Sequence, residues 1–418
     1  MLVNGKYKDG LIRLAAGIEV NAGEFPVKVL IPDSLMDLPS PGDAGTPIDF
    51  IDLKAQQQVI LPALLENIFR VLSHGQYIMG PEVSELEARL ADYTGAGHAI
   101  SCASGTDALL MALMALGVGP GDAVFTTPFT FIATAEVIQL LGATPVFADI
   151  DPRTFNIDPG ALEGAITGLP RNPRTTSLKP RGVIPVDLFG QPADYDVIKE
   201  IAGKHGLFVL GDAAQSFGAT YKGKRAGALA PVTATSFFPA KPLGGYGEGG
   251  AIFTADEEMA AVLRSIRNHG QGIHRYENIR VGINGRLDTL QAAVLLAKLQ
   301  IFDREVEARQ KVARRYNEAL APVVEVPFVR QECTSVYAQY SVLSGNREAI
   351  QQRLTDAGIP TAVYYPLPLH LQGAFAGLGY KPGDFPVSEW ASKRIFSLPM
   401  HPYLDEGLQG KIIAAILS

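Results

Sequence analysis

The sequence predicts an α/β fold, in which a mostly parallel seven-stranded sheet lies between helices and a smaller α+β domain follows. Three observations support this prediction. Apolar strand-like segments alternate with helical ones from about Ala99 to Thr254, and such alternation favours a parallel sheet covered by helices. The run Leu207-Phe-Val-Leu210 lies between two glycines, as is typical of a buried parallel strand. The 418 residues suit one large and one smaller domain.

The expected elements follow in chain order. Strands are predicted near residues 99–102, 123–127, 144–149, 182–186, 207–211, 234–238 and 250–253. Helices are expected between most of them, for example at 131–141 and 194–204. Residues 292–315, rich in Ala, Leu, Glu and Arg, are predicted to be helical and to lead into the smaller domain. There, the alternation at 336–343 and a short helix near 347–357 predict an α+β arrangement.

The chain is predicted to have three parts. Residues 1–47 form an N-terminal extension and linker, 48–305 a large domain and 306–418 a small C-terminal domain. Within the extension, residues 32–47 are rich in Pro, Gly, Asp and Ser and are predicted to be a linker. Residues 1–31 are interpreted either as a small β-rich appendage packed on the rest of the chain or as a dispensable extension, and no function is assigned to them.

Composition narrows the class of protein. The net charge of −7 gives no reason to expect a nucleic-acid or anionic-membrane partner. Two cysteines, Cys102 and Cys333, form no disulfide framework and are typical of a reducing cytoplasm. No apolar run is long enough to span a bilayer, and no secretory pattern opens the chain. A cytoplasmic protein is therefore expected.

Asp212 and Lys241 are the residues most informative about function. Asp212 follows the strand 207–211, so it is expected at the carboxyl end of a central strand, where open α/β sheets bind ligands. Lys241 lies in the run Ser236-Phe-Phe-Pro-Ala-Lys-Pro-Leu-Gly-Gly. Pyridoxal phosphate chemistry needs a lysine for a Schiff base and a carboxylate for the protonated pyridine nitrogen. The alternatives are a helix-capping aspartate and a solvated lysine.

Two further parts of such a site occur in the right order. Ser104-Gly105-Thr106 lies between a predicted strand and a predicted helix, where hydroxyls and free N–H groups bind anions. Ser236 supplies a hydroxyl that can reach the same phosphate. Phe131 follows the strand at 123–127 and is a candidate to cover a cofactor ring. The alternatives are plain helix capping by Ser104 and Thr106, and a core position for Phe131.

With these motifs in place, the chain resembles the DegT/StrS family of nucleotide-sugar aminotransferases, among the fold-type I pyridoxal phosphate enzymes. The resemblance extends over about residues 48–418 in unbroken order. The matching segments are Ile48-Asp-Phe-Ile-Asp-Leu, Gly75-Gln-Tyr-Ile-Met-Gly-Pro, Ser104-Gly-Thr-Asp-Ala-Leu, Asp149-Ile-Asp-Pro, Asp212-Ala-Ala-Gln-Ser, Ser236-Phe-Phe-Pro-Ala-Lys, Gly282-Ile-Asn-Gly-Arg-Leu-Asp and Ser397-Leu-Pro-Met-His-Pro.

The resemblance implies a role for each matching position. Lys241 would hold the cofactor as a Schiff base and move the proton, Asp212 would bind the pyridine nitrogen, and Gln215 would lie near the ring hydroxyl. Phe131 would stack on the ring. The resemblance further implies a homodimer with shared active sites. In each site, the cofactor phosphate would be bound by Gly105, Thr106, Ser236 and the partner's Asn284. The substrate carboxylate would be bound by the partner's Arg286 and by Tyr365, and Tyr364 would also contact the substrate.

The resemblance also implies a reaction. Within the family, Tyr337-Ala-Gln-Tyr and Tyr364-Tyr-Pro-Leu-Pro-Leu resemble the enzymes that use L-glutamate to aminate C3 of a UDP-linked 2-acetamido-3-oxo uronate sugar, a precursor of O-antigen in lipopolysaccharide. One departure is that these enzymes have a histidine where this chain has Tyr364. The alternatives are amination of another dTDP- or UDP-linked 3-keto or 4-keto hexose, and a non-catalytic cofactor-binding regulator. Lys241 disfavours a sugar dehydratase, which needs a histidine there.

Other motifs carry less weight. Gly244-Gly-Tyr-Gly-Glu-Gly-Gly lacks the strand-to-helix setting of a dinucleotide loop, and its glycines are expected to let the backbone pass close to the lysine segment. The seven histidines have no zinc-site spacing, so no metal is expected. His269 either lines the site or belongs to a structural turn.

Overall fold

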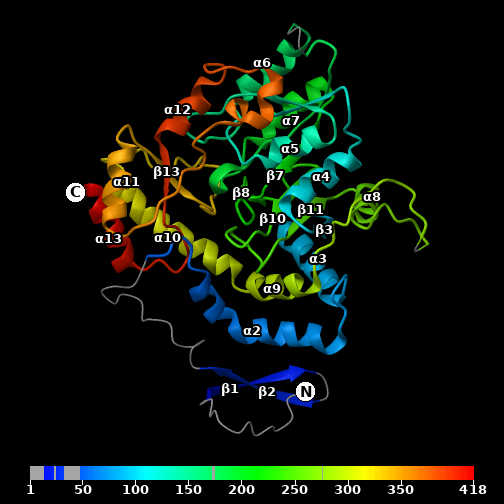
Figure 1. Cartoon of the computed structure of the whole chain (residues 1–418), viewed down its shortest axis with the longest axis vertical. Coiled ribbons are helices and arrows are strands. Elements are labelled where there is room, and N and C mark those ends of the chain that lie inside the picture. The colour runs from blue at the N-terminus through cyan, green and yellow to red at the C-terminus, as the bar shows by residue number, and fades with distance from the viewer. Residues whose placement is uncertain (1–13, 23–24, 33–47, 172–174, 275) are drawn as a thin grey trace.

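The computed structural model describes residues 14–22, 25–32, 48–171, 175–274 and 276–418. Its centre is a seven-stranded sheet with the strand order β3-β11-β10-β7-β6-β4-β5 (Figure 1). The strands are β3 (His98–Cys102), β4 (Asp122–Thr126), β5 (Thr144–Phe147), β6 (Lys179–Val183), β7 (Phe208–Asp212), β10 (Val232–Ser236) and β11 (Gly250–Thr254). β11 runs antiparallel to β3 and β10, and the other neighbouring pairs are parallel. The mostly parallel seven-stranded sheet expected from the sequence is confirmed.

Helices cover both faces of this sheet, which explains the apolar strands. In β4, Val124 packs on one face, whereas Ala123 and Phe125 pack on the other, because successive strand residues point to opposite faces. The first face is covered by α4 (Gly105–Ala115), α5 (Ala133–Leu140) and α8 (Glu257–Arg267). The second is covered by α3 (Pro81–Thr94), α6 (Pro159–Gly168), α7 (Tyr195–His205) and α9 (Thr289–Leu299).

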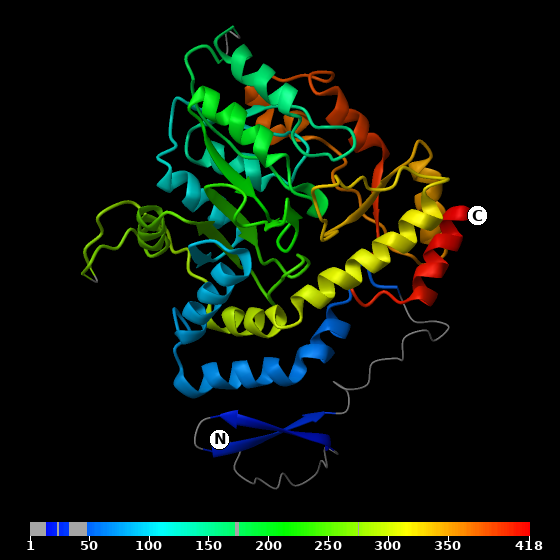
Figure 2. The ribbon, with the colours of Figure 1, turned by 180° about the vertical axis from the view of Figure 1, so that it is seen from behind.

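The C-terminal part has a hydrophobic core of its own. Its helices are α10 (Phe302–Leu320), α11 (Arg347–Asp356) and α13 (Glu406–Leu417), and its strands β12 (Tyr340–Leu343) and β13 (Ile395–Leu398) pair antiparallel. Figure 2 shows α10 running from beneath the large sheet to this part. The helical structure expected over 292–315 is confirmed, but it is divided into two helices: the chain turns at Ile301, whose N–H donates to Lys298 O at 3.1 Å, between α9 and α10. The predicted boundary between residues 305 and 306 falls inside α10 and stays a prediction.

Asp149 attaches the C-terminal part to the large sheet. It follows β5, and its carboxylate accepts hydrogen bonds from the N–H groups of Val387 and Ser388 at 2.9 and 3.0 Å, and from the Ser388 hydroxyl. Both donors lie in the first turn of α12 (Pro386–Arg394), where free N–H groups attract a negative charge. The carboxylate therefore caps a helix that lies more than two hundred residues away in the sequence.

A buried charged network surrounds the first turns of α10. The Glu305 carboxylate accepts hydrogen bonds from the Gln56 amide at 2.9 Å and the Tyr403 hydroxyl at 2.6 Å. One turn later, the Arg309 guanidinium donates to the carbonyl oxygens of Tyr337 and Met400, both at 3.2 Å. Glu305 and Arg309 are both buried. The network thus joins segments from the beginning, middle and end of the chain.

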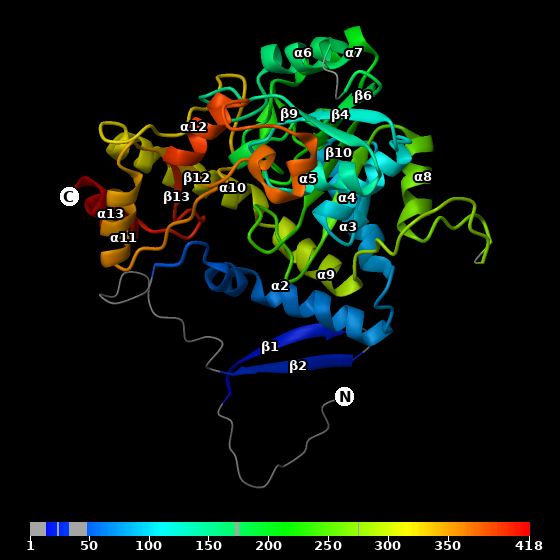
Figure 3. The same ribbon diagram turned by 45° about the horizontal axis from the view of Figure 1, so that its top comes forward.

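The N-terminal extension contains a hairpin. β1 (Leu14–Ala22) and β2 (Phe25–Pro32) pair antiparallel, and the hairpin lies along α2 (Leu53–His74) (Figure 3). The β structure expected for this segment is present in these residues, and the hairpin does not decide whether the extension is dispensable. The predicted linker lies outside the described residues except for Pro32. No helix in the described part of the chain is long and apolar enough to cross a membrane.

Short elements complete the described structure. They are the strand pair β8 (Thr220–Tyr221) and β9 (Lys224–Arg225) and the 3-10 helices η1 (Leu169–Arg171), η2 (Leu188–Gly190), η3 (Leu369–Leu371) and η4 (Gly373–Leu378).

Candidate active site

A cavity of about 710 Å³ lies where the central strands end. Asp212 and Ser236, the last residues of β7 and β10, both line it. The carboxyl ends of parallel strands meet at one edge of a sheet, and ligands bind there in open α/β folds. Every predicted site residue except two lines this cavity: Gly105, Thr106, Phe131, Asp212, Gln215, Ser236, Lys241, Tyr364 and Tyr365.

The Asp212 carboxylate is buried and held by two donors. Oδ2 accepts a hydrogen bond from the Thr134 hydroxyl at 2.8 Å, and Oδ1 accepts one from the Ala214 N–H at 3.1 Å. Burial raises the pKa of Asp212, whereas these two hydrogen bonds and the nearby Lys241 lower it. The carboxylate is therefore oriented and suited to a cationic partner in the cavity. The alternative of a helix-capping aspartate does not describe these contacts.

Lys241 lies between proline residues and lines the same cavity as Asp212. Its N–H donates to the Phe238 carbonyl at 2.8 Å, which closes a turn that directs the side chain. Burial lowers the pKa of the Lys241 amine, and the charge of Asp212 opposes that effect. A buried lysine with a lowered pKa can act as a nucleophile, and the alternative of a solvated lysine is wrong.

The start of α4 forms a cradle at the other end of the cavity. The Ser104 hydroxyl accepts from Asp107 N at 3.0 Å, so Ser104 has the helix-capping role that was the alternative prediction. The N–H groups of Gly105 and Thr106 lie in the first turn, where anions bind. Gly105 lies against β10, because a Cβ at this position would be 2.6 Å from the Ser236 Cβ. This contact keeps the helix end, the glycine and the Ser236 hydroxyl together.

Aromatic and amide side chains form the remaining wall. Phe131 is 55% exposed, so the alternative of a core position is wrong. Its ring centroid lies 6.5 Å from that of Tyr365. The Gln215 amide accepts from Phe189 N at 2.8 Å and donates to the Tyr365 hydroxyl at 3.2 Å. Burial raises the pKa of Tyr364 and Tyr365, so both hydroxyls stay protonated and able to donate.

Asn284 and Arg286 lie outside this cavity within the single chain. Asn284 forms a β-bridge with Asn268, and the Arg286 guanidinium donates to the Asn268 side-chain oxygen at 3.0 Å. The adjacent segment carries exposed apolar side chains, with Ile273 at 93% and Val281 at 84% exposure. Their contribution to a partner's cavity therefore stays a prediction. His269, with a φ of 58°, lies in the turn of this segment and does not line the cavity.

Sequence reasoning missed several residues that line the cavity. They are Thr134, Glu248, Gln339, Leu369 and Gln372, among others. Thr134 lies in the first turns of α5 and Gln339 directly before β12. Gln339 and Leu369 belong to the segments Tyr337-Ala-Gln-Tyr and Tyr364-Tyr-Pro-Leu-Pro-Leu, which carry part of the family resemblance, but the resemblance assigns no role to either residue. The C-terminal part thus supplies one wall of the cavity, because Gln339, Leu369 and Gln372 belong to it.

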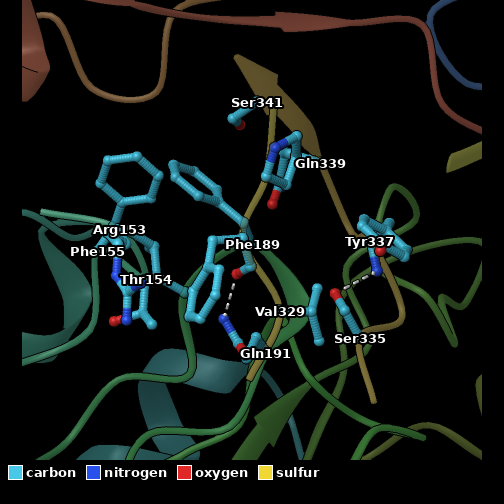
Figure 4. A pocket seen from close by; sticks show the side chains of 13 residues that line it. Arg153, Thr154, Phe155, Phe189, Gln191, Val329, Ser335, Tyr337, Gln339 and Ser341 are labelled. Carbon is cyan, nitrogen blue, oxygen red and sulfur yellow. Dashed lines mark hydrogen bonds between the residues drawn. The ribbon is translucent and has the colours of Figure 1, made fainter. Parts of the chain in front are cut away.

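A second, narrow hollow adjoins Gln339. It has a volume of about 20 Å³ and lies between Arg153, Phe155 and Phe189 on one side and residues 327–341 on the other (Figure 4). The Arg153 guanidinium lies 4.0 Å from the centroid of the Phe328 ring. Gln339 lines both this hollow and the large cavity. It therefore lies at the junction of the two.

The glycine-rich run at 244–250 and the histidines considered as metal ligands lie in the described part of the structure. A Cβ on Gly244 would lie 2.4 Å from the Pro239 carbonyl oxygen, so this glycine lets the backbone pass close to the lysine segment, as expected. Among the described residues, no group of three or more His, Cys, Asp or Glu side chains is arranged to hold a metal ion.

Comparison with known proteins gives consistent matches. A model of the DegT/DnrJ/EryC1/StrS aminotransferase family matches residues 60–417. The UDP-2-acetamido-2-deoxy-3-oxo-D-glucuronate aminotransferase of Pseudomonas aeruginosa is 56% identical over 372 residues, which is 89% of this chain and 99% of that protein. A Geobacillus stearothermophilus protein named pleiotropic regulatory protein is 44% identical over 373 residues, 88% of this chain and 97% of that one.

A solved structure agrees with these sequence matches. The crystal structure of a DegT DnrJ EryC1 StrS aminotransferase from Brucella abortus has a TM-score of 0.86 and 52% sequence identity, over 88% of this chain and 98% of that one. The overall fold is therefore shared across almost the whole of that protein.

Proposed function

Because this chain belongs to the DegT/DnrJ/EryC1/StrS aminotransferase family, we propose that it moves an amino group from L-glutamate to C3 of a UDP-linked 2-acetamido-3-oxo uronate sugar. The observation that carries the choice of sugar is the 56% identity, over 99% of its length, to the aminotransferase named for UDP-2-acetamido-2-deoxy-3-oxo-D-glucuronate. The aminotransferase activity and the dependence on pyridoxal phosphate follow from the family. The product would be a cytoplasmic precursor of a lipopolysaccharide O-antigen.

The residues of the cavity fit this cofactor. Gly105 makes room at the start of α4, since any side chain there would meet Ser236, and a phosphate would be bound by the first-turn N–H groups and the Thr106 and Ser236 hydroxyls. Asp212 would pair with the pyridine nitrogen and Lys241 would hold the cofactor covalently. The bound cofactor supplies an electron sink for the substrate carbon that loses or gains the amino group.

Lys241 and Asp212 then have separate tasks. Burial lowers the pKa of the Lys241 amine, so this amine gives up its proton more readily than an ordinary lysine. It would take a proton from the substrate carbon and return it one position away. Asp212, held by Thr134 and Ala214, would face the pyridine nitrogen of the bound cofactor. Phe131 would stack on the ring. The chemistry of both half-reactions thus uses one set of groups.

Substrate recognition is assigned to the dimer. Glutamate and the uronate sugar both carry a carboxylate, and in a two-step exchange they use one site in turn. A guanidinium binds a carboxylate bidentately, so the partner's Arg286 would serve both substrates, and the partner's Asn284 would contact the phosphate. The exposed segment with Ile273 and Val281 would be buried in the dimer interface. Tyr364 and Tyr365 would contact the sugar.

A regulatory role is the second candidate. The relative named pleiotropic regulatory protein is 44% identical over 88% of this chain, so similarity within the family does not by itself decide between catalysis and regulation. The observation that favours an enzyme is the cavity itself, with Lys241 and Asp212 lining one space of about 710 Å³ that also reaches Tyr364. Another keto hexose, linked to dTDP or UDP, is the alternative substrate.

The test follows each half-reaction separately in a single turnover. Glutamate should convert the bound cofactor to its amine form, and UDP-2-acetamido-2-deoxy-3-oxo-glucuronate should convert it back faster than a neutral 3-keto or 4-keto hexose. Arg286→Lys should slow both halves, by a factor of roughly 10 or more for one charge-assisted hydrogen bond. Faster turnover of the neutral sugar would reject the uronate, and no turnover with any keto sugar would favour the regulator.

A further inference from the structure

Gln339 has a buried hydrogen-bond acceptor that the protein does not use. Its Oε1 atom is buried and has no hydrogen-bond partner among the described residues. Other described residues also carry unpaired buried polar atoms, but none of those residues lines the cavity that contains Lys241. A buried acceptor without a donor is costly, and native structures pair nearly all of them. The position of this acceptor therefore points to a ligand.

The backbone before Gln339 is held firmly in place. The Val336 N–H donates to the Gly190 carbonyl at 3.0 Å, and a Cβ on Gly190 would lie 2.7 Å from Tyr337 N. The Arg309 guanidinium donates to the Tyr337 carbonyl at 3.2 Å. β12 begins immediately after Gln339. The side chain is thus presented at the junction of cavity and hollow by a segment that cannot easily move.

No described residue donates a hydrogen bond to Gln339 Oε1. Phe155 and Phe189 line the hollow with it (Figure 4), and phenyl rings cannot donate a conventional hydrogen bond. The Tyr365 hydroxyl, which accepts from Gln215 at 3.2 Å, does not donate to Gln339 Oε1. Gln372, the other amide of this wall, differs because its nitrogen donates to the Leu367 carbonyl at 3.2 Å. Gln372 is therefore a matched control: the same residue type in the same cavity, but already paired.

Gln339 is not one of the residues assigned to the phosphate of the cofactor. That cradle is assigned to Gly105, Thr106 and Ser236, whereas Gln339 lines the same cavity as Tyr364 and Tyr365, which are assigned to the substrate. Apart from the amino group that reacts, glutamate at neutral pH has only two carboxylates. Carboxylates accept hydrogen bonds and do not donate them, so glutamate has no spare donor for Gln339 Oε1. A 3-keto sugar carries neutral donors on the carbons next to the reacting one, an amide N–H at C2 and a hydroxyl at C4.

Resting on the function proposed above, we infer that Gln339 accepts a hydrogen bond from a neutral donor beside the keto carbon of the sugar. It selects the nucleotide sugar in the second half-reaction and takes no part in the first. Its amide nitrogen is free to donate in turn to a carbonyl oxygen, as in a pair of amides. Gln339 is thus a specificity residue that leaves the chemistry of Lys241 and Asp212 unchanged.

The first experiment compares Gln339→Met with Gln372→Met in the full-length holoenzyme, because methionine keeps length and removes the hydrogen bonds. For Gln339→Met, kcat/KM for the UDP-3-keto sugar should fall about tenfold, which is the effect of losing one neutral hydrogen bond. The glutamate half-reaction should stay within about twofold of wild type. Gln372→Met should leave both within about twofold. Equal loss in both halves, or no loss in the sugar half, would overturn the inference.

A second experiment identifies the donor. The 2-deoxy and 4-deoxy analogues of the UDP-3-keto sugar are each compared between wild type and Gln339→Met. The analogue that lacks the donor should be insensitive to the substitution, as in a double-mutant cycle. If both analogues remain as sensitive as the parent sugar, no such hydrogen bond exists.

The remaining outcomes separate this inference from the proposed function. If Gln339→Met fails to fold, as judged by circular dichroism and cofactor content, Gln339→Leu is tested by the same two comparisons. Wild type without turnover of any UDP-3-keto sugar would reject the proposed function itself. Wild-type turnover with an unchanged Gln339→Met enzyme would reject only the role of Gln339.

Discussion

The hydroxyl of Thr134 donates a 2.8 Å hydrogen bond to Oδ2 of Asp212, although the two residues are 78 positions apart in the chain. Thr134 belongs to α5 and Asp212 ends β7, so the packing of one helix on the sheet orients the acid. The bond also lowers the pKa of a carboxyl whose burial raises it. Thr134 is therefore a positioning residue that acts through Asp212.

Thr134→Val should weaken catalysis without unfolding the protein. Without the hydroxyl, the pKa of Asp212 rises further, so the carboxylate is protonated at higher pH and the acid limb of the activity profile moves upward. At neutral pH we expect a loss of roughly fivefold to tenfold, the value of about one hydrogen bond. The pH profile of kcat/KM checks this, and Thr134→Ser should restore the wild-type limb. An unshifted limb in Thr134→Val would remove Thr134 from this role.

Gly105→Ala should impair cofactor binding. A Cβ at this position would lie 2.6 Å from the Ser236 Cβ, so the start of α4 or the end of β10 must shift, and the phosphate cradle opens. The dissociation constant for pyridoxal phosphate, measured by absorbance titration, should rise at least tenfold, a factor typical of overpacking by about 1–3 kcal/mol. Gly119→Ala is the control, because a Cβ there meets nothing within 4 Å. Equal affinities of the two variants would contradict the expected contact.

Mixed dimers should recover activity from two inactive parents. Lys241→Ala removes the covalent attachment point, and Asn284→Ala with Arg286→Ala removes the groups assigned to the partner's site. In a heterodimer of these proteins, one of two sites has all its residues, since an isologous interface builds two equal sites. We expect up to about half of the wild-type activity per heterodimer. Purified heterodimers with no more activity than their parents would show that each site lies within one chain.

Acid should destabilise the protein through His401. Burial lowers the pKa of His401 to about 4 from an ordinary value of 6.5. Between these values the unfolded chain binds a proton that the folded chain does not, so stability falls as the pH is lowered through this window. The loss reaches roughly 3 kcal/mol at the low end. The free energy of unfolding, measured with urea between pH 7 and 4, should depend less on pH for His401→Gln than for wild type. His274→Gln, which replaces an exposed histidine, is the control and should show the same pH dependence as wild type.

The sheet could be predicted from sequence because its strands are apolar on both faces. The segments at 207–211 and 250–253 match β7 and β11 within one residue. β6 differs most: the expected strand at 182–186 begins at Lys179 instead, whereas β10 is shifted by two residues and β5 ends two residues early. The first residues of β6, among them Lys179 and Arg181, extend beyond the covering helices and remain partly exposed. Their polar side chains hide the start of the strand from an analysis based on apolar runs.

The centre of the site could also be predicted, but not its surroundings. Asp212 lies at the end of an apolar strand and Lys241 in a distinctive run, so local sequence identifies both. Thr134 has ordinary neighbours, and Gln339 lies in a segment that carries the family resemblance without showing a role for this residue. The roles of both residues come from contacts made across the fold. Gln339 reaches the cavity only because the preceding residues pass over Gly190. Long-range contacts of this kind leave no mark on a short stretch of sequence.

The network around α10 bears on whether the two parts of the chain can fold independently. Glu305 binds Gln56 and Tyr403, while Arg309, one turn on, binds the carbonyls of Tyr337 and Met400. Dividing the chain between residues 305 and 306 would separate the Glu305 carboxylate from the Tyr403 hydroxyl and from the nearby charge of Arg309, although Gln56 stays with Glu305 and both carbonyls stay with Arg309. A buried charge that loses a partner in this way is destabilising. The two parts therefore have separate cores but share one helix, so neither is expected to fold alone and the whole chain should melt as one cooperative unit.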